Sequence, residues 1–322
     1  MLSLFVRVVA GLLLGLGLNA VQGQIYPSKA VKLVVPFPPG GGTDVTARLF
    51  AERLTGKLGQ TVIVENLTGA GGMLGTAAVA HATPDGYTLL VGQTGPNTIA
   101  PNLRVSPGFD AENDFAPIST LIRMPLFLVV PANSPYKTLK DLVAAGRMDQ
   151  TLNYASAGPG TLGHLTAELF NAVAGTKFAI VQYRGSAPAL MGLYSRDAAF
   201  HFASGVDALP QMNGGRLRAL AVVGEHRTPL ASDVPTAAEA GVSGLTANLW
   251  YGLLAPRKTP QAIIERLHRE VVAILAEPEM KAKLRTLASE ASPSTPQEMG
   301  AMIRNDIARY AKLVKMAGIK IQ

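Results

Sequence analysis

The sequence predicts an α/β protein of two lobes around a cleft, and three observations lead to this fold class. Short apolar runs alternate with helical patterns through most of the 322 residues, which is typical of βα units with mostly parallel sheets flanked by helices. Prolines break the alternation around residues 122–131 and again between 223 and 251, where we expect the chain to cross between lobes. After Trp250 the pattern is helical only, so these last helices should pack outside a sheet.

The expected elements follow from apolar periodicity and from helix start signals. We expect strands at residues 31–35, 61–65, 87–91, 115–122, 127–130, 178–182, 198–202, 217–223 and 250–255. We expect helices at residues 43–58, 73–81, 139–145, 162–173, 187–193, 207–212 and 236–240, followed by the C-terminal helices, of which the last covers 297–316.

Residues 1–23 have the pattern of a signal peptide. Arg7 gives a minimal basic region, residues 8–18 are apolar, and residues 21–23 offer small side chains for cleavage. Eleven apolar residues are too few to span a membrane, which takes roughly 20. We therefore expect a soluble mature protein, exported to a bacterial periplasm.

Composition excludes several classes of site. The sequence contains no cysteine, which excludes disulfides, thiolate metal sites and a lipid-anchored N-terminus. The net charge is +7, but the basic residues are scattered and many lie on the C-terminal helical segments, as solvated helix faces do. No basic segment is interleaved with aromatic residues, so we expect no nucleic-acid partner.

The segment from Val35 to Asp44 is the strongest local signal. Prolines and glycines force a tight loop after an apolar strand, and a helix then starts at Thr43 or Asp44. Backbone N–H groups at a helix start, together with the helix dipole, favour an anion such as a carboxylate or a phosphate. The predicted contacts here are Gly40, Gly41, Gly42, Thr43 and Asp44, although a capping role for Asp44 is the commoner alternative.

Similar loops follow other predicted strands. Because the carboxyl ends of parallel strands share one edge of a sheet, we expect these loops to converge on one small-molecule site. The hydroxyl groups among them could cap helices or donate to an anion, and Arg184 could pair with a carboxylate or be a surface charge. The predicted site residues in these loops are Gly71, Gly72, Gln93, Thr94, Ser156, Gly158, Gly160, Thr161, Tyr183 and Arg184.

Cofactor and catalytic motifs are weak. Residues 69–75 imitate a dinucleotide fingerprint, but they follow a second strand and no ribose-binding acid comes after them. No Gly-x-Ser-x-Gly elbow occurs, and the histidines lack metal-ligand spacing. We expect no cofactor, no metal and no enzyme; the alternatives are an exported hydrolase using Ser156 or Ser204 with a histidine, and a ligand-loaded periplasmic sensor.

Several segments together resemble the Bug or TctC-type receptors of tripartite tricarboxylate transporters. The resemblance is carried by residues 35–44, 64–72, 84–89, 152–156, 183–190, 217–222, 233–236 and 239–241. It implies a monomeric two-lobed periplasmic-binding-protein fold that captures a small organic carboxylate and presents it to membrane subunits of the transporter. The implied lobes are residues 24–125 plus 250–322, and residues 126–249.

One departure from the family pattern lies at residues 201–204, which read His-Phe-Ala-Ser. Ala203 stands where many relatives carry an acid, beside Ser204, and both belong to the predicted site. Loss of that carboxylate would enlarge the pocket and remove repulsion toward a distal anionic group. This favours a non-amino organic acid, such as a dicarboxylate or an aromatic carboxylate.

Overall fold

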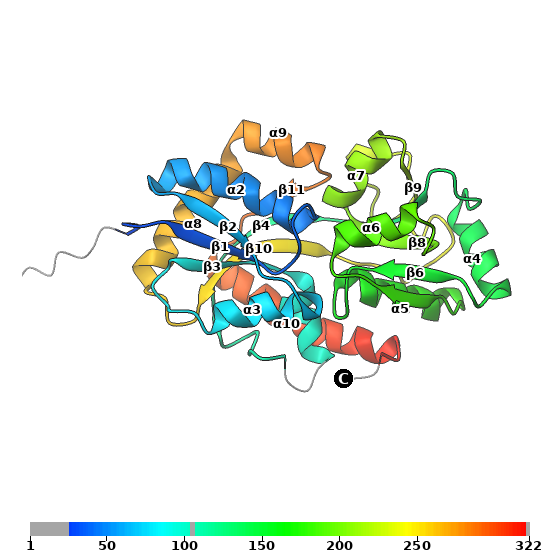
Figure 1. Cartoon of the computed structure of the whole chain (residues 1–322), viewed down its shortest axis with the longest axis horizontal. Helices are drawn as coiled ribbons and strands as arrows, with labels where there is room; N and C mark the ends of the chain where they lie inside the picture. The colour runs from blue at the N-terminus through cyan, green and yellow to red at the C-terminus, as the bar shows by residue number, and fades with distance from the viewer. Residues whose placement is uncertain (1–25, 104–106, 320–322) are drawn as a thin grey trace, which may run out of the picture.

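The computed structural model describes residues 26–103 and 107–319, which form two mixed sheets with helices on their faces (Figure 1). The predicted signal peptide lies outside the described residues. Among the described residues, none of the helices has both the length and the apolar character needed to cross a membrane.

The first sheet has the strand order β11-β4-β10-β3-β1-β2. Its strands are β1 (Val31–Val35), β2 (Val62–Asn66), β3 (Thr88–Gln93), β4 (Phe115–Met124), β10 (Leu249–Pro256) and β11 (Glu290–Ala291). The helices of this lobe are α2 (Gly42–Leu58), α3 (Met73–Ala80), α8 (Gln261–Ala276), α9 (Pro278–Thr286) and α10 (Pro296–Met316), with the short turns η1 (Ala70–Gly72), η2 (Gly95–Ile99) and η3 (Ala100–Asn102).

The second sheet has the order β7-β6-β8-β5-β9. Its strands are β5 (Leu126–Pro131), β6 (Asn153–Ser156), β7 (Ala179–Gln182), β8 (Phe200–Ser204) and β9 (Leu217–Val223). The helices beside it are α4 (Leu139–Met148), α5 (Leu162–Ala174), α6 (Ser186–Tyr194) and α7 (Gly205–Asn213), with the turn η4 (Pro229–Ala231). Phe200 is fully buried here and contacts the rings of Tyr154, Phe170, Phe178 and Phe202, so aromatic packing makes the core of this lobe.

The two sheets are joined by extended chain and by one helix. Only Pro125 separates β4 of the first sheet from β5 of the second, and the chain returns from β9 to β10. Helix α10 packs against β4 and also contacts α5 in the other lobe. Near this crossing, the Tyr310 hydroxyl donates to the carbonyl oxygen of Asn248 at 3.5 Å. Two chain crossings and the contact of α10 with α5 are thus among the links between the lobes.

The structure differs from the expected elements in three respects. The sheets are mixed rather than mostly parallel, because β5 and β10 run antiparallel to their neighbours. The predicted helix at 236–240 is a series of turns, in which Thr236 and Glu239 bond to each other's backbone and Arg227 pairs with Glu239. Strand β6 is missing from the expected strands, because its four residues include the polar Asn153 and Ser156 and form no apolar run.

Candidate functional site

A cavity of about 60 Å³ lies between the two lobes. Both lobes contribute to its wall, and the lining side chains are partly apolar and partly hydroxyl-bearing. The lining residues are Phe37, Pro38, Gly41, Gly42, Thr43, Gln93, Leu126, Ala157, Thr161, Leu162, Gly163, Ser186, Ala187, His201, Phe202, Ser204, Asp207, Leu249 and Tyr251.

Four helices begin at this cavity. Gly42 and Thr43 open α2, Leu162 and Gly163 open α5, and Ser186 and Ala187 open α6. The fourth is α7, whose N-cap Ser204 lines the cavity as well. Since each helix N-terminus carries a partial positive charge and N–H groups without helical partners, the site is electropositive through its backbone.

Six of the predicted residues line the cavity: Gly41, Gly42, Thr43, Gln93, Thr161 and Ser204. They come from loops after β1, β3 and β6 and from the end of β8, so the structure brings together loops of both lobes. Thr43 is 4% exposed, and its hydroxyl oxygen accepts a hydrogen bond from the Gln93 side chain at 3.3 Å.

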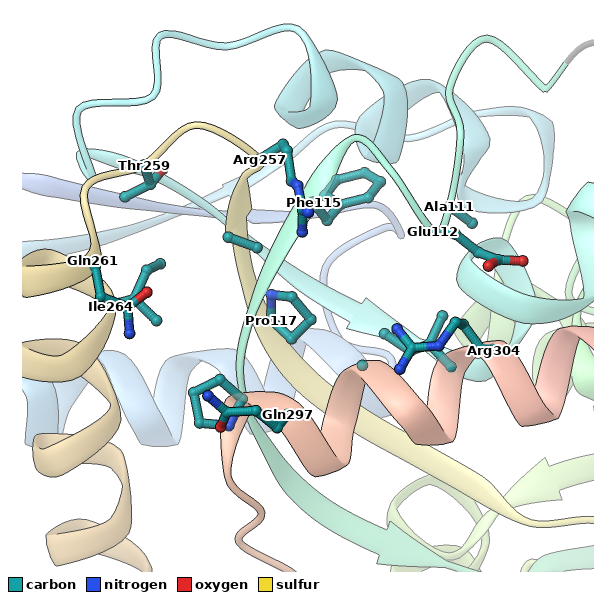
Figure 2. Close-up of a pocket in the computed structure, with 14 residues that line it drawn as sticks. Ala111, Glu112, Phe115, Pro117, Arg257, Thr259, Gln261, Ile264, Gln297 and Arg304 are labelled. Carbon is teal, nitrogen blue, oxygen red and sulfur yellow. The ribbon is translucent and has the colours of Figure 1, made fainter.

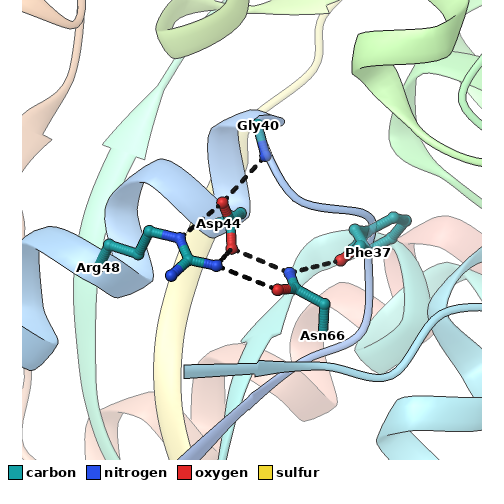
Figure 3. A network of polar contacts seen from close by, with 5 residues as sticks. All are labelled: Phe37, Gly40, Asp44, Arg48 and Asn66. Atoms are coloured by element: carbon teal, nitrogen blue, oxygen red, sulfur yellow. Dashed lines mark hydrogen bonds and ion pairs between the residues drawn. The ribbon is translucent and has the colours of Figure 1, made fainter. Parts of the chain in front are cut away.

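Asp44 lies outside the cavity lining and holds the first loop in place (Figure 3). It accepts hydrogen bonds from the Gly40 N–H at 2.9 Å, from the Asn66 amide at 2.9 Å and from Arg48 Nε at 3.0 Å. Asn66 also donates to the carbonyl oxygen of Phe37. Gly40 and Asp44 therefore fix the loop from Phe37 onward rather than lining the cavity.

The ionisation of Asp44 depends on this network. Burial opposes the charged form, but the hydrogen bonds from Arg48, Gly40 and Asn66 and the Arg48 charge outweigh it, and the pKa of Asp44 lies below its ordinary value. The negative charge of Asp44 thus strengthens the hydrogen bonds that hold this loop in place.

The glycine loops of the two lobes touch each other beside the cavity. A Cβ atom on Gly71 would lie 1.9 Å from the carbonyl oxygen of Pro159, and one on Gly158 would lie 3.2 Å from the Gly71 Cα. Gly160 packs on the side chain of Ala100, whose Cβ would lie 3.2 Å from a Cβ atom on Gly160. These predicted residues form close contacts between the lobes and do not line the cavity.

Three other predicted residues contact segments near the cavity but do not line it themselves. Gly72 leaves room for the ring of Phe37, since a Cβ atom there would lie 2.8 Å from it. Thr94 is fully buried, and its hydroxyl oxygen accepts from the Trp250 N–H at 3.0 Å. Ser156 is also buried, and it accepts from the Gly158 N–H at 3.2 Å.

Tyr183, Arg184 and Ala203 do not line the cavity either. Arg184 is exposed, and Tyr183 is half-buried with its hydroxyl against Gly192. Ala203 is fully buried in the hydrophobic cluster behind β8. Ala203 is thus absent from the cavity lining, and the acid that lines the cavity is Asp207.

Some of the lining residues carry no local sequence signal that marks them as part of a site. Asp207 and Tyr251 lie in ordinary helical and strand patterns, and the fold alone brings them to the cavity, whereas Ser186 belongs to the segment 183–190 that carries the family resemblance. Phe37 and Pro38 lie within the segment from Val35 to Asp44, so the sequence could have indicated that they add apolar surface to the cavity.

Tyr251 and His201 are the buried titratable side chains of the lining. Burial, followed by the nearby Asp207 charge, raises the pKa of the Tyr251 phenol, although hydrogen bonds with Thr43 and Ser204 oppose this. Burial lowers the pKa of His201, although its bond to Ala155 and the Asp207 charge oppose the shift. His201 Nδ1 donates to the carbonyl oxygen of Ala155 at 2.7 Å, and both pKa shifts favour the uncharged form of the side chain.

The arrangement gives little support to catalysis or to metal binding. The Ser204 hydroxyl donates to Asp207, the Ser156 hydroxyl bonds to Gly158, and within residues 26–103 and 107–319 neither serine bonds to a histidine. In the same part of the chain, no three His, Asp or Glu side chains are placed to hold a metal ion. What the site offers is donors for a small anion.

Figure 2 shows a larger cavity, of about 550 Å³, on the first lobe. It lies between the start of β4, the end of β10 and the first turns of α8 and α10, with Arg257, Arg304 and Glu112 around it. None of the predicted residues lines it, and the second lobe contributes nothing to its wall. The smaller cavity is therefore the better candidate, because both lobes build it.

The family model of the tripartite tricarboxylate transporter family receptor, TctC, matches residues 46–319. The chain belongs to this receptor family. It is 33% identical to a UPF0065 protein from the tcbD-tcbE intergenic region of Pseudomonas sp. (strain P51), over 96% of this chain and 93% of that protein. It is 34% identical to the protein BugT of Bordetella pertussis, over 94% of this chain and 93% of that protein.

Solved structures agree on the two-lobed fold. R. palustris Rpa4515 with adipate has a TM-score of 0.89 and 35% identity, covering 92% of this chain and 99% of that one. MatC of Rhodopseudomonas palustris with bound malate has a TM-score of 0.86 and 32% identity, covering 90% of this chain and all of that one. The periplasmic binding protein BugD has a TM-score of 0.89 and 32% identity, covering 92% of this chain and all of that one.

Replacing the loop carboxylate should destabilise the protein in a pH-dependent way. We expect Asp44→Asn to lower the free energy of unfolding by about 1–3 kcal/mol at pH 7, because the donors of Arg48 and Gly40 lose a charged acceptor. The stabilisation is fully present above the unfolded pKa of about 3.9 and is lost as the pH falls through the lower folded pKa.

Urea denaturation at pH 7 and at pH values below about 4 measures this effect. Asp233→Asn, at an exposed acid without a hydrogen-bonded partner among the described residues, is the control and should leave stability nearly unchanged. A deficit of Asp44→Asn that stayed constant from neutral to acid pH would contradict the role given to the charge.

Proposed function

We propose that this protein is a periplasmic solute-binding receptor that captures a small organic carboxylate between its lobes and presents it to the membrane subunits of a tripartite tricarboxylate transporter. The convergence of four helix N-termini from both lobes on one cavity carries this proposal. Such an arrangement binds a negatively charged group through backbone donors, without needing a basic side chain.

The ligands of similar proteins support this chemistry. Rpa4515 was solved with adipate and MatC with malate, and both are organic acids. The family match to a receptor supports a binding function rather than turnover, and BugD supports a periplasmic location.

We infer that residues 26–125 with 250–319 and residues 126–249 move as two lobes. The segments through Pro125 and between β9 and β10 are the connections about which they would rotate. The contacts of Gly71 with Pro159 and of Gly42 with Asp207 belong to the closed arrangement. A ligand that contacts both lobes shifts the population toward this closed state.

A thermal-shift screen of the mature protein, freed of carried-over ligand, tests the function. An organic acid at 100 times its dissociation constant should stabilise the protein by about 2.7 kcal/mol. The screen should include mono- and dicarboxylates, sugars and amino acids, with calorimetry on the hits. Stabilisation by sugars alone, with none by any carboxylate, would reject the proposal.

Removing one hydroxyl from the cavity should weaken binding of the acid found in the screen. We expect Thr43→Ala to raise the dissociation constant roughly fivefold, which corresponds to about 1 kcal/mol for one hydrogen bond. Isothermal titration calorimetry measures the change, and Thr151→Ala, at an exposed position of the second lobe, should leave affinity as it is. Unchanged affinity in Thr43→Ala would show that the ligand binds elsewhere.

Blocking the backbone contact should weaken binding without touching the cavity. Gly71→Ala places a Cβ atom against Pro159 and should lower affinity at least tenfold, roughly 1.4 kcal/mol, because the closed state is obstructed. Gly59→Ala is a matched control: its φ of +68° is nearly that of Gly71 at +66°, but no atom lies within 4 Å of the new Cβ. If both variants bound like wild type, closure would not need this contact.

A further inference from the structure

The carboxylate of Asp207 occupies part of the electropositive site. Its Oδ1 accepts a hydrogen bond from the Gly42 N–H at 2.8 Å, across the two lobes. Its Oδ2 accepts from the Ser186 hydroxyl at 2.8 Å and from the Ser204 hydroxyl at 2.6 Å. Three donors therefore hold this one side chain at the edge of the cavity.

Each of these donors belongs to the start of a helix. Gly42 is the first residue of α2, Ser186 is the first residue of α6, and Ser204 caps α7. Asp207 itself lies in the first turn of α7. The protein's own negative charge thus meets the positive ends of three helices, in the position that a ligand carboxylate would otherwise favour.

One of the four helix starts is left for the ligand. The first turn of α5 faces the cavity through Leu162 and Gly163, and its N-cap Thr161 lines the cavity too. Its own first turn carries no acidic residue. A ligand carboxylate is therefore best accommodated at this end.

The charged residues of the lining determine which other charged groups the ligand can have besides this carboxylate. Among the described residues that line it, none is Lys or Arg, and Asp207 is the single acid. His201 is buried and donates from Nδ1 to the carbonyl oxygen of Ala155, and burial lowers its pKa, which favours the uncharged ring. No basic side chain in the lining would offset a second carboxylate brought close to Asp207.

We propose that Asp207 determines the charge of the ligand: the site takes an organic acid with a single carboxylate and rejects a second one. The carboxylate binds at the start of α5, and the uncharged remainder packs against Phe37, Leu126 and Phe202. This inference rests on the proposed function. Two like charges about 5 Å apart at the effective dielectric of a protein surface disfavour binding by roughly 300-fold.

Pairs of acids with equal chain length test this directly: butyrate against succinate, and hexanoate against adipate. We expect wild-type protein to bind at least one monocarboxylate at least tenfold more tightly than its dicarboxylate partner, as measured by calorimetry. Asp207→Asn keeps the shape and removes the charge, so it should raise the affinity for the dicarboxylate relative to its monocarboxylate partner at least tenfold. Asp197→Asn removes an exposed acid of the same lobe and should leave the ratio unchanged.

The outcomes separate this inference from the function on which it rests. Dicarboxylates that bind wild type as tightly as their partners, or a ratio that Asp207→Asn does not move, would overturn the role of Asp207 and leave carboxylate binding intact. Absence of binding by all four acids and by the wider screen would reject the proposed function and this inference with it. The wild-type ratio decides the matter even if the variant folds poorly.

Discussion

The site is built on the partial charges of helix ends, and this places a demand on the rest of the structure. Backbone donors attract an anion only if the loops that carry them keep their geometry, because none of the described residues that line the cavity is Lys or Arg. The Asp44, Arg48 and Asn66 network meets this demand for the first loop. Ser156 and Thr94 do the same for two others. These polar residues near the cavity therefore stabilise the backbone of the loops and do not line the cavity.

The contact between lobes obeys the same logic. Gly71 meets Pro159, and Gly42 meets Asp207, so main chain is involved on at least one side of both contacts. Main-chain atoms have fixed positions relative to their sheets, whereas long side chains lose rotamer freedom when they become ordered. Closing two glycine-rich edges against each other therefore costs little side-chain entropy.

Local sequence patterns predicted the parts of the molecule that are locally determined. The strand at 31–35 and the helix after Gly41 follow from apolar periodicity and from the proline and glycine run, and the structure contains both. The convergence of the loops followed from the rule that parallel strands share an edge, and it held where β1 and β3 are parallel. Strand direction at β5 and β10 depends on which sheet each joins, which no local pattern records.

The residues of the site were harder to assign for the same reason. A glycine or hydroxyl near a strand end can face the ligand or brace the loop, and composition does not distinguish the two. Thr43 faces the cavity whereas Ser156 is turned into the structure. Asp207 reaches the cavity only because α7 begins beside α2 in the folded protein. Its importance is a property of tertiary packing.

The C-terminal helix has a mechanical consequence. Because α10 is anchored on β4 yet also rests on α5, separating the lobes must slide or shed part of its surface. Two crossing segments alone would leave the lobes free to rotate, whereas the contact of α10 with α5 would limit how far the lobes can open. The angle between the lobes thus depends in part on α10, which lies far in sequence from the residues that line the cavity.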